Sequence, residues 1–292
     1  MYISDIKNLL ITLCTTLLLF GCSRQRLDEK ADVIVSIPPL KYIIEQITDN
    51  NLKVEILLPS GAGPETYELT PRQYMALKQA KLVFTTGLIP FEQSMVGDME
   101  IPDRVINLSK GIDLIEGSCT HDHAHHHDGH HHGIDPHIWT SPRELKIMAR
   151  NAYDAIIKEY PDSTQYSAAY NKLMERLSEL DHACQAMCAE SSAKAFVIYH
   201  PAFSYFARAY GIEQIAIENE GKEPSVKYIA NIIERAREKN VRALLFQTQY
   251  PRSVAEVIAK DMGLKAYEID PLAENIIENI CHIAQIITNQ PQ

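Results

Sequence analysis

The sequence lacks the patterns that mark several common activities. It has no HExxH motif and no glycine-bounded serine or cysteine, which are the usual signatures of zinc proteases and of nucleophilic hydrolases. It has no CxxC pair, so a zinc site made of thiolates is not expected. Basic residues are also few: 28 lysines and arginines stand against 38 aspartates and glutamates, and the net charge of −10 argues against nucleic acid as a partner.

The apolar run near the N-terminus is too short to cross a bilayer. Leu9–Phe20 has only twelve residues, and it leads directly into Gly21 and Cys22. This order resembles a bacterial lipoprotein signal, so we predict a signal peptide at residues 1–21, lipid on Cys22 and a tether at residues 22–30. A plain signal peptide and an N-terminal anchor are the alternatives, and each of the three places the rest of the chain outside the cytoplasm.

The cysteines beyond Cys22 allow one disulfide in an oxidising compartment. They are Cys119, Cys184, Cys188 and Cys281. The sequence does not say which two would pair, and buried free thiols are the alternative.

After residue 30 the chain repeats a short apolar run, turn residues and a helical stretch. Runs this short and apolar are typical of strands that helices cover on both faces. We predict strands at residues 33–37, 54–58, 82–84 and 105–108 in the first half, and at 196–199, 213–217, 243–246 and 266–269 in the second. Four such units in each half predict an α/β fold of two lobes, each a mainly parallel four-stranded sheet flanked by helices.

A capped helix is predicted at the end of the first half. Ser141 has the character of an N-cap, Pro142 of a first helical residue and Glu144 of the capping-box partner. The helix should then run to about Tyr160, because Pro161 interrupts the pattern.

A second, longer helix is predicted from about residue 164 to residue 189. Its apolar residues alternate four and three positions apart: Tyr166, Tyr170, Leu173, Leu177, Leu180, Cys184 and Met187. This narrow stripe fits a dimeric coiled coil or, as we prefer, one long rigid helix that joins two lobes, because it lies between the two strand arrays. The predicted domains are therefore an N-terminal lobe at residues 31–163, a linking helix at 164–191 and a C-terminal lobe at 192–292.

Nine of the twelve histidines lie between His121 and His137. Imidazole is the commonest metal ligand, so this tract concerns a metal. Between residues 120 and 133 no apolar residue is larger than alanine, and we therefore expect the loop 118–133 to be disordered when no metal is bound.

A tight site needs ligands on rigid elements, and open α/β folds bind ligands at the carboxyl ends of their strands. Four candidates lie just beyond such ends: Glu65, His137, His200 and Asp270. Two come from each predicted lobe, an arrangement that would enclose a divalent transition metal between the lobes. We predict that Asp135 accepts the other ring N–H of His137, and a turn aspartate before proline is the alternative.

Four segments together resemble the cluster A-I substrate-binding lipoproteins of bacterial zinc/manganese ABC importers. They are LPSGAGPETYELTP, DPHIWTSP, YHPAFSYFARAYGI and YEIDPL, in the family's order over nearly all of the mature chain. The resemblance implies two α/β lobes joined by a rigid helix, with one metal buried between them. It also implies delivery of that metal to an ABC permease in the inner membrane, by a protein that Cys22 anchors in the periplasm or at the cell surface. We expect a monomer.

The family's ligands carry over to His137, His200 and Asp270. Histidine at the His200 position is usual in zinc members, whereas manganese and iron members usually have glutamate there. The first family ligand is usually the histidine of G-A-x-P-H-x-Y-E, and this chain has Glu65 instead. Either Glu65 is a ligand or three protein ligands and a water hold the ion, with Glu68 as a less favoured substitute. A second oxygen donor gives Mn²⁺ or Fe²⁺ more weight without excluding zinc.

The other histidines of the tract resemble the histidine- and acid-rich loop of zinc-type members. We hypothesise that they form a weak accessory zinc site, made of His121, His123, His125, His126, His127, His130, His131 and His132. A low-complexity insert without function is the alternative. The tract favours zinc over manganese, because imidazole prefers zinc.

The favoured function is capture of Zn²⁺ for a transporter, without catalysis. The alternatives are a Mn²⁺ or Fe²⁺ binding protein of the same class and a zinc hydrolase in which Glu65 is the general base. A surface adhesin, a role often attached to the family, has no motif to support it. Since ligand histidines must be deprotonated, binding should weaken below about pH 6.

Overall fold

The computed structural model describes residues 31–98, 102–116, 133–161, 163–218, 225–250 and 252–288. The predicted signal peptide, the tether and Cys22 lie outside the described residues, as do Cys119 and the eight histidines of the predicted accessory site. Within the described ranges, no helix combines the length and the hydrophobicity that a membrane span needs.

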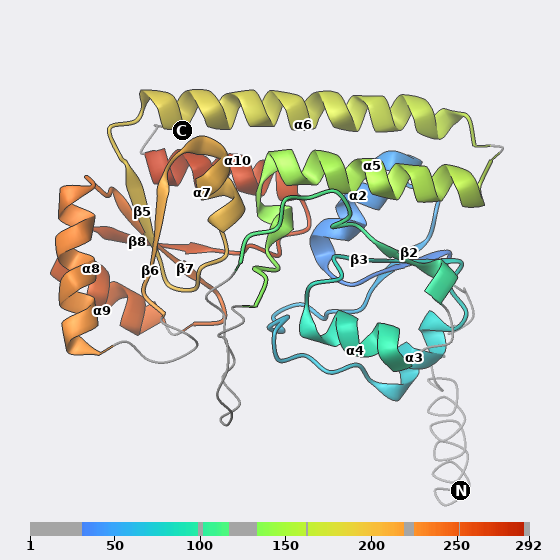
Figure 1. The fold of residues 1–292 in the computed structure, drawn as a ribbon, viewed down its shortest axis with the longest axis horizontal. Helices are drawn as coiled ribbons and strands as arrows, with labels where there is room; N and C mark the ends of the chain where they lie inside the picture. The colour runs from blue at the N-terminus through green and yellow to red at the C-terminus, as the bar shows by residue number, and fades with distance from the viewer. Residues whose placement is uncertain are drawn as a thin grey trace, which may run out of the picture. The chain divides into compact units, whose positions relative to one another are not determined.

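All eight predicted strands are present, and they form two parallel four-stranded sheets (Figure 1). The strands are β1 Val33–Val35, β2 Val54–Ile56, β3 Leu82–Thr85, β4 Val105–Asn107, β5 Ala195–Ile198, β6 Glu213–Ala216, β7 Ala243–Gln247 and β8 Lys265–Ile269. The first sheet has the order β2-β1-β3-β4 and the second the matching order β6-β5-β7-β8. Every residue of β1, β3, β5 and β7 is buried, as expected of strands covered on both faces. The predicted fold class is thus confirmed.

Helices connect the strands and cover both faces of the sheets. They are α2 Pro38–Thr48, α3 Pro71–Leu77, α4 Pro90–Asp98, α5 Pro142–Glu159, α6 Gln165–Glu190, α7 Ser204–Tyr210, α8 Val226–Glu238, α9 Arg252–Met262 and α10 Ile276–Thr288. Two short 3₁₀ turns, η2 Pro102–Arg104 and η3 Ile138–Thr140, complete the described elements.

The long helix α6 packs on α2, α5 and α10 (Figure 1). Its buried stripe consists of Tyr166, Leu173, Leu177, Leu180, Cys184 and Cys188. Because this stripe is covered by helices of its own chain, it offers no seam for the coiled coil that was the alternative interpretation. One hydrophobic cluster includes residues of the first sheet, of α6, of α10 and of the inner face of the second sheet. The two lobes therefore share a core.

The predicted capping box of α5 is absent. Helix α5 begins at Pro142 as expected, but Ser141 makes no side-chain capping bond. Glu144 instead accepts a hydrogen bond from Arg208 Nη2 of α7, at 3.0 Å. A long-range partner thus competes successfully with the local one, and sequence spacing alone does not reveal it.

Cys184, Cys188 and Cys281 are free thiols. Burial raises the pKa of Cys188 to about 11 and raises that of Cys184 further. Neither thiol is a thiolate at neutral pH, so both behave as packing residues of the α6 interface. The open choice between a disulfide and buried free thiols is decided for these three cysteines in favour of free thiols.

The carboxylate of Asp181 links α6 to α5 and to α7 by hydrogen bonds. Its carboxylate accepts hydrogen bonds from Lys146 Nζ (2.8 Å) and Arg143 Nε (3.2 Å) of α5, and from the Tyr210 hydroxyl of α7 (3.0 Å). Burial raises the pKa of Asp181, but the three hydrogen bonds together outweigh it and leave the pKa below its usual value.

We expect Asp181→Ala to lower the free energy of unfolding at pH 7 by about 1–3 kcal/mol, because three donors lose a charged acceptor. A depressed pKa stabilises the fold above the unfolded value and loses that contribution as the pH falls through the folded value, so the difference from wild type should shrink near pH 3. Urea unfolding at both pH values measures it. Asp154→Ala, at an exposed ion pair of α5, is the matched control and should change little. Equal losses in the two variants would contradict this role of Asp181.

Candidate metal centre

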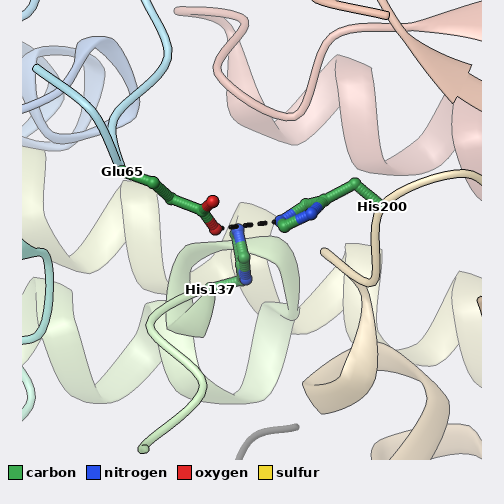
Figure 2. A group of neighbouring side chains, drawn as sticks. All are labelled: Glu65, His137 and His200. Carbon is green, nitrogen blue, oxygen red and sulfur yellow. Dashed lines mark ion pairs between the residues drawn. The ribbon is translucent and has the colours of Figure 1, made fainter. Parts of the chain in front are cut away.

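Three of the four predicted ligands come together in one place (Figure 2). Glu65 lies in the loop after β2, His137 immediately precedes η3, and His200 follows β5. One ligand atom from each of the three lies within 4.8 Å of the other two. The first lobe contributes Glu65 and His137, and the second contributes His200, so the cluster bridges the lobes.

The cluster is largely shielded from water. His137 is 4% exposed and His200 is 8% exposed. Glu65 is half-buried, and its Oε1 lies 3.1 Å from His200 Nε2. The two imidazole rings meet edge to face with their centroids 5.2 Å apart. Two nitrogen donors and one carboxylate oxygen at this separation fit the first coordination sphere of a divalent transition metal.

His137 is oriented by the predicted partner, Asp135. The Oδ1 atom of Asp135 accepts a hydrogen bond from His137 Nδ1 at 2.9 Å, and a second from the His137 backbone N–H at 2.9 Å. Burial would raise the pKa of Asp135, but the bonds to His137 lower it, so the carboxylate is charged. With Nδ1 donating, the lone pair of His137 is on Nε2 and is available to an ion.

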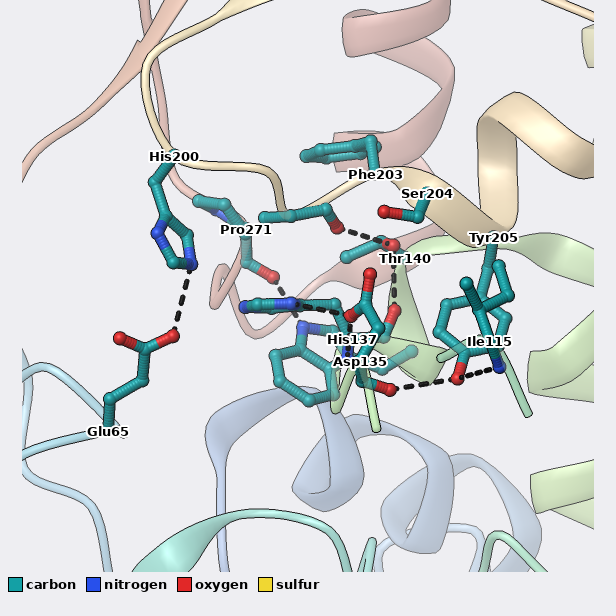
Figure 3. Close-up of polar contacts among 12 residues, drawn as sticks. Glu65, Ile115, Asp135, His137, Thr140, His200, Phe203, Ser204, Tyr205 and Pro271 are labelled. Atoms are coloured by element: carbon teal, nitrogen blue, oxygen red, sulfur yellow. Dashed lines mark hydrogen bonds and ion pairs between the residues drawn. The ribbon is translucent and has the colours of Figure 1, made fainter. Parts of the chain in front are cut away.

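The backbone of Asp135 is itself fixed by hydrogen bonds at both its N–H and its carbonyl (Figure 3). Its backbone N–H donates to Ile115 O at 2.9 Å, and its carbonyl accepts from the Tyr205 hydroxyl at 2.8 Å. The same hydroxyl accepts from Ile115 N–H at 3.2 Å. Because Tyr205 belongs to α7 of the second lobe, the segment that carries His137 is anchored across the lobe boundary.

His200 has a carboxylate partner that the sequence reasoning missed. Glu218 Oε2 lies 2.6 Å from His200 Nδ1. Glu218 lies just beyond the end of β6, so it meets the same criterion that selected Asp270. The sequence does not reveal the order of the strands in the sheet, and only the pairing of β6 with β5 brings Glu218 beside His200.

His200 carries a proton in the metal-free chain. Burial lowers its pKa, but the hydrogen bonds and charges of Glu218 and Glu65 raise it more, to about 9. Below that pH an imidazolium between two carboxylates occupies the cluster, and an ion has to displace its proton.

Asp270 does not belong to the cluster as described. It follows β8 as predicted, and its Oδ1 accepts from Leu272 N–H at 2.9 Å while its carbonyl accepts from Asn279 Nδ2 at 2.8 Å. The next residue, Pro271, accepts a hydrogen bond from Trp139 Nε1 at 2.9 Å (Figure 3). Asp270 is thus near the lobe boundary, but its carboxylate is engaged in a local turn.

A cavity of about 210 Å³ opens onto the three ligands. Both lobes line it, with the residues Gly63, Pro64, Glu65, Thr66, His137, Trp139, His200, Ala202, Gln247, Gln249, Tyr250, Pro271 and Leu272. Most of the exposed area of this lining is apolar, although polar side chains such as Gln247 and Tyr250 also line the cavity. A low-dielectric wall of this kind strengthens the attraction between the donors and a cation.

The chain resembles known zinc-uptake proteins over most of its length. The family model described as "ZnuA: Zinc-uptake complex component A periplasmic" matches residues 33–289. The chain is 28% identical over 284 residues to the zinc-binding lipoprotein AdcA of Streptococcus pneumoniae, an alignment that covers 91% of this chain and 55% of that protein. This chain therefore spans about half the length of that relative.

Two further comparisons cover more of the relative. The high-affinity zinc uptake system protein ZnuA of Bacillus subtilis is 29% identical over 255 residues, which is 84% of this chain and 79% of that protein. A crystal structure of ZnuA superposes with a TM-score of 0.78 at 31% identity, and the match covers 89% of this chain and 99% of that one.

Proposed function

The chain belongs to the ZnuA family of periplasmic zinc-uptake components, and we propose that it captures Zn²⁺ between its lobes and delivers the ion to the permease of an ABC importer. The observation that carries the proposal is the convergence of Glu65, His137 and His200 across the lobe boundary. Zinc is the cargo here, so the site has only to hold the ion and release it. The names of the two relatives, a zinc-binding lipoprotein and a zinc uptake protein, support the choice of metal.

We assign the donor atoms by the hydrogen bonds of the two histidines. Nδ1 of each ring is directed at a carboxylate, Asp135 or Glu218, which leaves Nε2 of each for zinc. Glu65 supplies the third donor through its carboxylate. Asp270 is the proposed fourth ligand, which requires its side chain to leave the local turn when the ion binds.

Mn²⁺ or Fe²⁺ remains the alternative cargo. Glu65 and Asp270 would give two oxygen donors beside two nitrogens, a harder set than three imidazoles. The zinc hydrolase is less favoured. It would require Glu65 as a general base beside an ion with an open position, yet Glu65 Oε1 lies 3.1 Å from His200 Nε2, where a ligand belongs.

The position in the cell follows from the family and the N-terminal sequence. We propose that residues 1–21 are a signal peptide and that Cys22 carries the lipid, which places the chain outside the cytoplasm. We also propose that the chain works as a monomer. The proposed domains are an N-terminal lobe at residues 31–163, a linking helix at 164–191 and a C-terminal lobe at 192–292. The histidine tract within the loop 118–133 would be a weak accessory zinc site.

Metal titration of the full chain tests the proposal, with calorimetry for affinity and elemental analysis for stoichiometry. We expect one tight Zn²⁺ in wild type and in a chain that lacks residues 121–132. Glu65→Ala should weaken that site, because one of the donors is lost. Asp270→Asn should also weaken it if the fourth ligand is correctly assigned.

Comparison of the ligand substitutions with the deletion of residues 121–132 shows whether tight zinc binds at the cleft between the lobes or at the histidine tract. Loss of tight binding on deletion of residues 121–132, with Glu65→Ala unchanged, would make the tract the receptor and would refute the cleft site. Tighter binding of Mn²⁺ than of Zn²⁺ would favour the alternative cargo.

A further inference from the structure

Glu218 is a carboxylate that contacts the cluster and is not one of the proposed ligands. Its position follows from the sheet. In the pairing of β5 with β6, Ile198 lies beside Ala216, so two residues further on His200 lies beside Glu218. The backbone N–H of Glu218 donates to Tyr199 O at 2.9 Å, which continues the ladder past the strand ends.

The other neighbouring strand fixes the backbone of His200. In the pairing of β5 with β7, Ile198 lies beside Leu245, so His200 lies beside Gln247. The Gln247 side chain donates to His200 O at 2.7 Å and accepts from His200 N–H at 3.2 Å. The backbone position of His200 is therefore set without Glu218, and what Glu218 adds concerns the imidazole ring.

The carboxylate of Glu218 is itself oriented. Tyr250 donates its hydroxyl to Glu218 Oε2 at 3.0 Å, and the Tyr250 ring lies nearly parallel to the His200 ring with centroids 6.0 Å apart. The Glu218 side chain is 15% exposed, so water competes little for its bond to His200. A buried, oriented carboxylate on one ring nitrogen fixes both the tautomer and the rotation of the ring.

We propose that Glu218 is a positioning residue for the zinc site. Its carboxylate holds the His200 ring with Nδ1 protonated and Nε2 directed at the ion. The proposal rests on the zinc-binding function proposed above. It gives each histidine its own carboxylate, Asp135 in the first lobe and Glu218 in the second. Glu218 does not bind the ion itself, because it contacts the nitrogen on the far side of the ring from Glu65 (Figure 3 shows Glu65 facing His200).

The experiment compares the full wild-type chain with Glu218→Ala, Glu218→Gln, Tyr250→Phe and Glu256→Gln. Zinc affinity is measured by competition with a chelator. The ring nitrogens of His200 are read from long-range ¹H–¹⁵N spectra of histidine-labelled protein loaded with one equivalent of zinc. Thermal unfolding of the metal-free variants shows whether each is folded.

We expect Glu218→Ala to lower zinc affinity about 10- to 100-fold, in the range typical for partners of metal-bound histidines. Glu218→Gln should rescue part of the loss, since its amide oxygen still accepts from Nδ1, and Tyr250→Phe should have a smaller effect. Glu256 is exposed on α9, so the control variant Glu256→Gln should bind zinc as the wild-type chain does. In wild type the spectra should show Nδ1–H and zinc on Nε2, and in Glu218→Ala this single state should be lost.

Two results would overturn the inference alone. One is a folded Glu218→Ala that binds zinc as wild type does, and the other is wild-type protein with zinc on Nδ1 of His200. A wild-type chain without any tight zinc site would overturn the proposed function and this inference with it.

Discussion

Alanine at His200 or at His137 is expected to lower zinc affinity by more than about 100-fold, the largest loss of any single substitution considered for this chain. Each histidine supplies one of two nitrogen donors, and both are nearly fully buried at the boundary of the lobes. Neither position has a second imidazole within the described cluster that could replace it. Competition with a chelator at one equivalent of zinc measures the loss.

The control for this prediction is a histidine outside the cluster. His182→Ala removes an exposed imidazole from α6 and should leave the affinity unchanged. Glutamine at His137 or His200 preserves much of the side-chain volume and should lose affinity nearly as alanine does, which separates lost coordination from lost packing. Retention of wild-type affinity by either folded alanine variant would remove that residue from the site.

Zinc affinity is expected to rise about tenfold for each pH unit between roughly pH 6.5 and pH 9, and to level off above that range. The reason is the proton on His200, whose pKa the surrounding Glu218 and Glu65 raise to about 9 against the effect of burial. This window extends well above the limit near pH 6 that unperturbed histidines predict. The two carboxylates beside the His200 ring cause the difference, and no sequence pattern shows that they lie there.

The same proton links the pH to the stability of the metal-free chain. A histidine whose pKa is raised on folding adds stability that is fully present below the unfolded value of 6.5 and is lost as the pH rises through about 9. Calorimetry in buffers of different ionisation enthalpy should detect about one proton released per zinc near pH 7.5. A zinc affinity that is constant from pH 7 to pH 9, with no proton released, would contradict this account.

The sequence predicts most of the fold because the elements carry strong local signals. Short apolar runs identify all eight strands, and the stripe from Tyr166 onwards identifies α6. His200 lies directly beyond the end of β5, as the general behaviour of parallel sheets predicts, whereas Glu65 and His137 lie in the longer connections that follow β2 and β4. What local patterns do not contain is the lateral order of strands, and for this reason Glu218 is missed.

Two other differences have the same origin in long-range contacts. Glu144 pairs with Arg208 of the second lobe instead of closing a capping box with Ser141. Asp270 directly follows the expected strand, yet its carboxylate accepts a hydrogen bond from Leu272 N–H and stays outside the cluster. A residue's place along a strand can be inferred from the sequence, whereas the direction of its side chain depends on neighbours that are distant in the chain.

The core that both lobes share has a consequence for how the site meets its ion. Residues of α6, α10 and both sheets belong to one buried cluster, so a wide hinge opening would expose apolar side chains such as Leu177 and Ile280 to water. The imidazoles of His137 and His200 are consequently pre-organised when the chain folds. Little binding free energy is then diverted into selecting a competent conformation. We expect the arriving cation to exchange with a proton at two histidines that are already in place, so that only the side chain of Asp270 has to move.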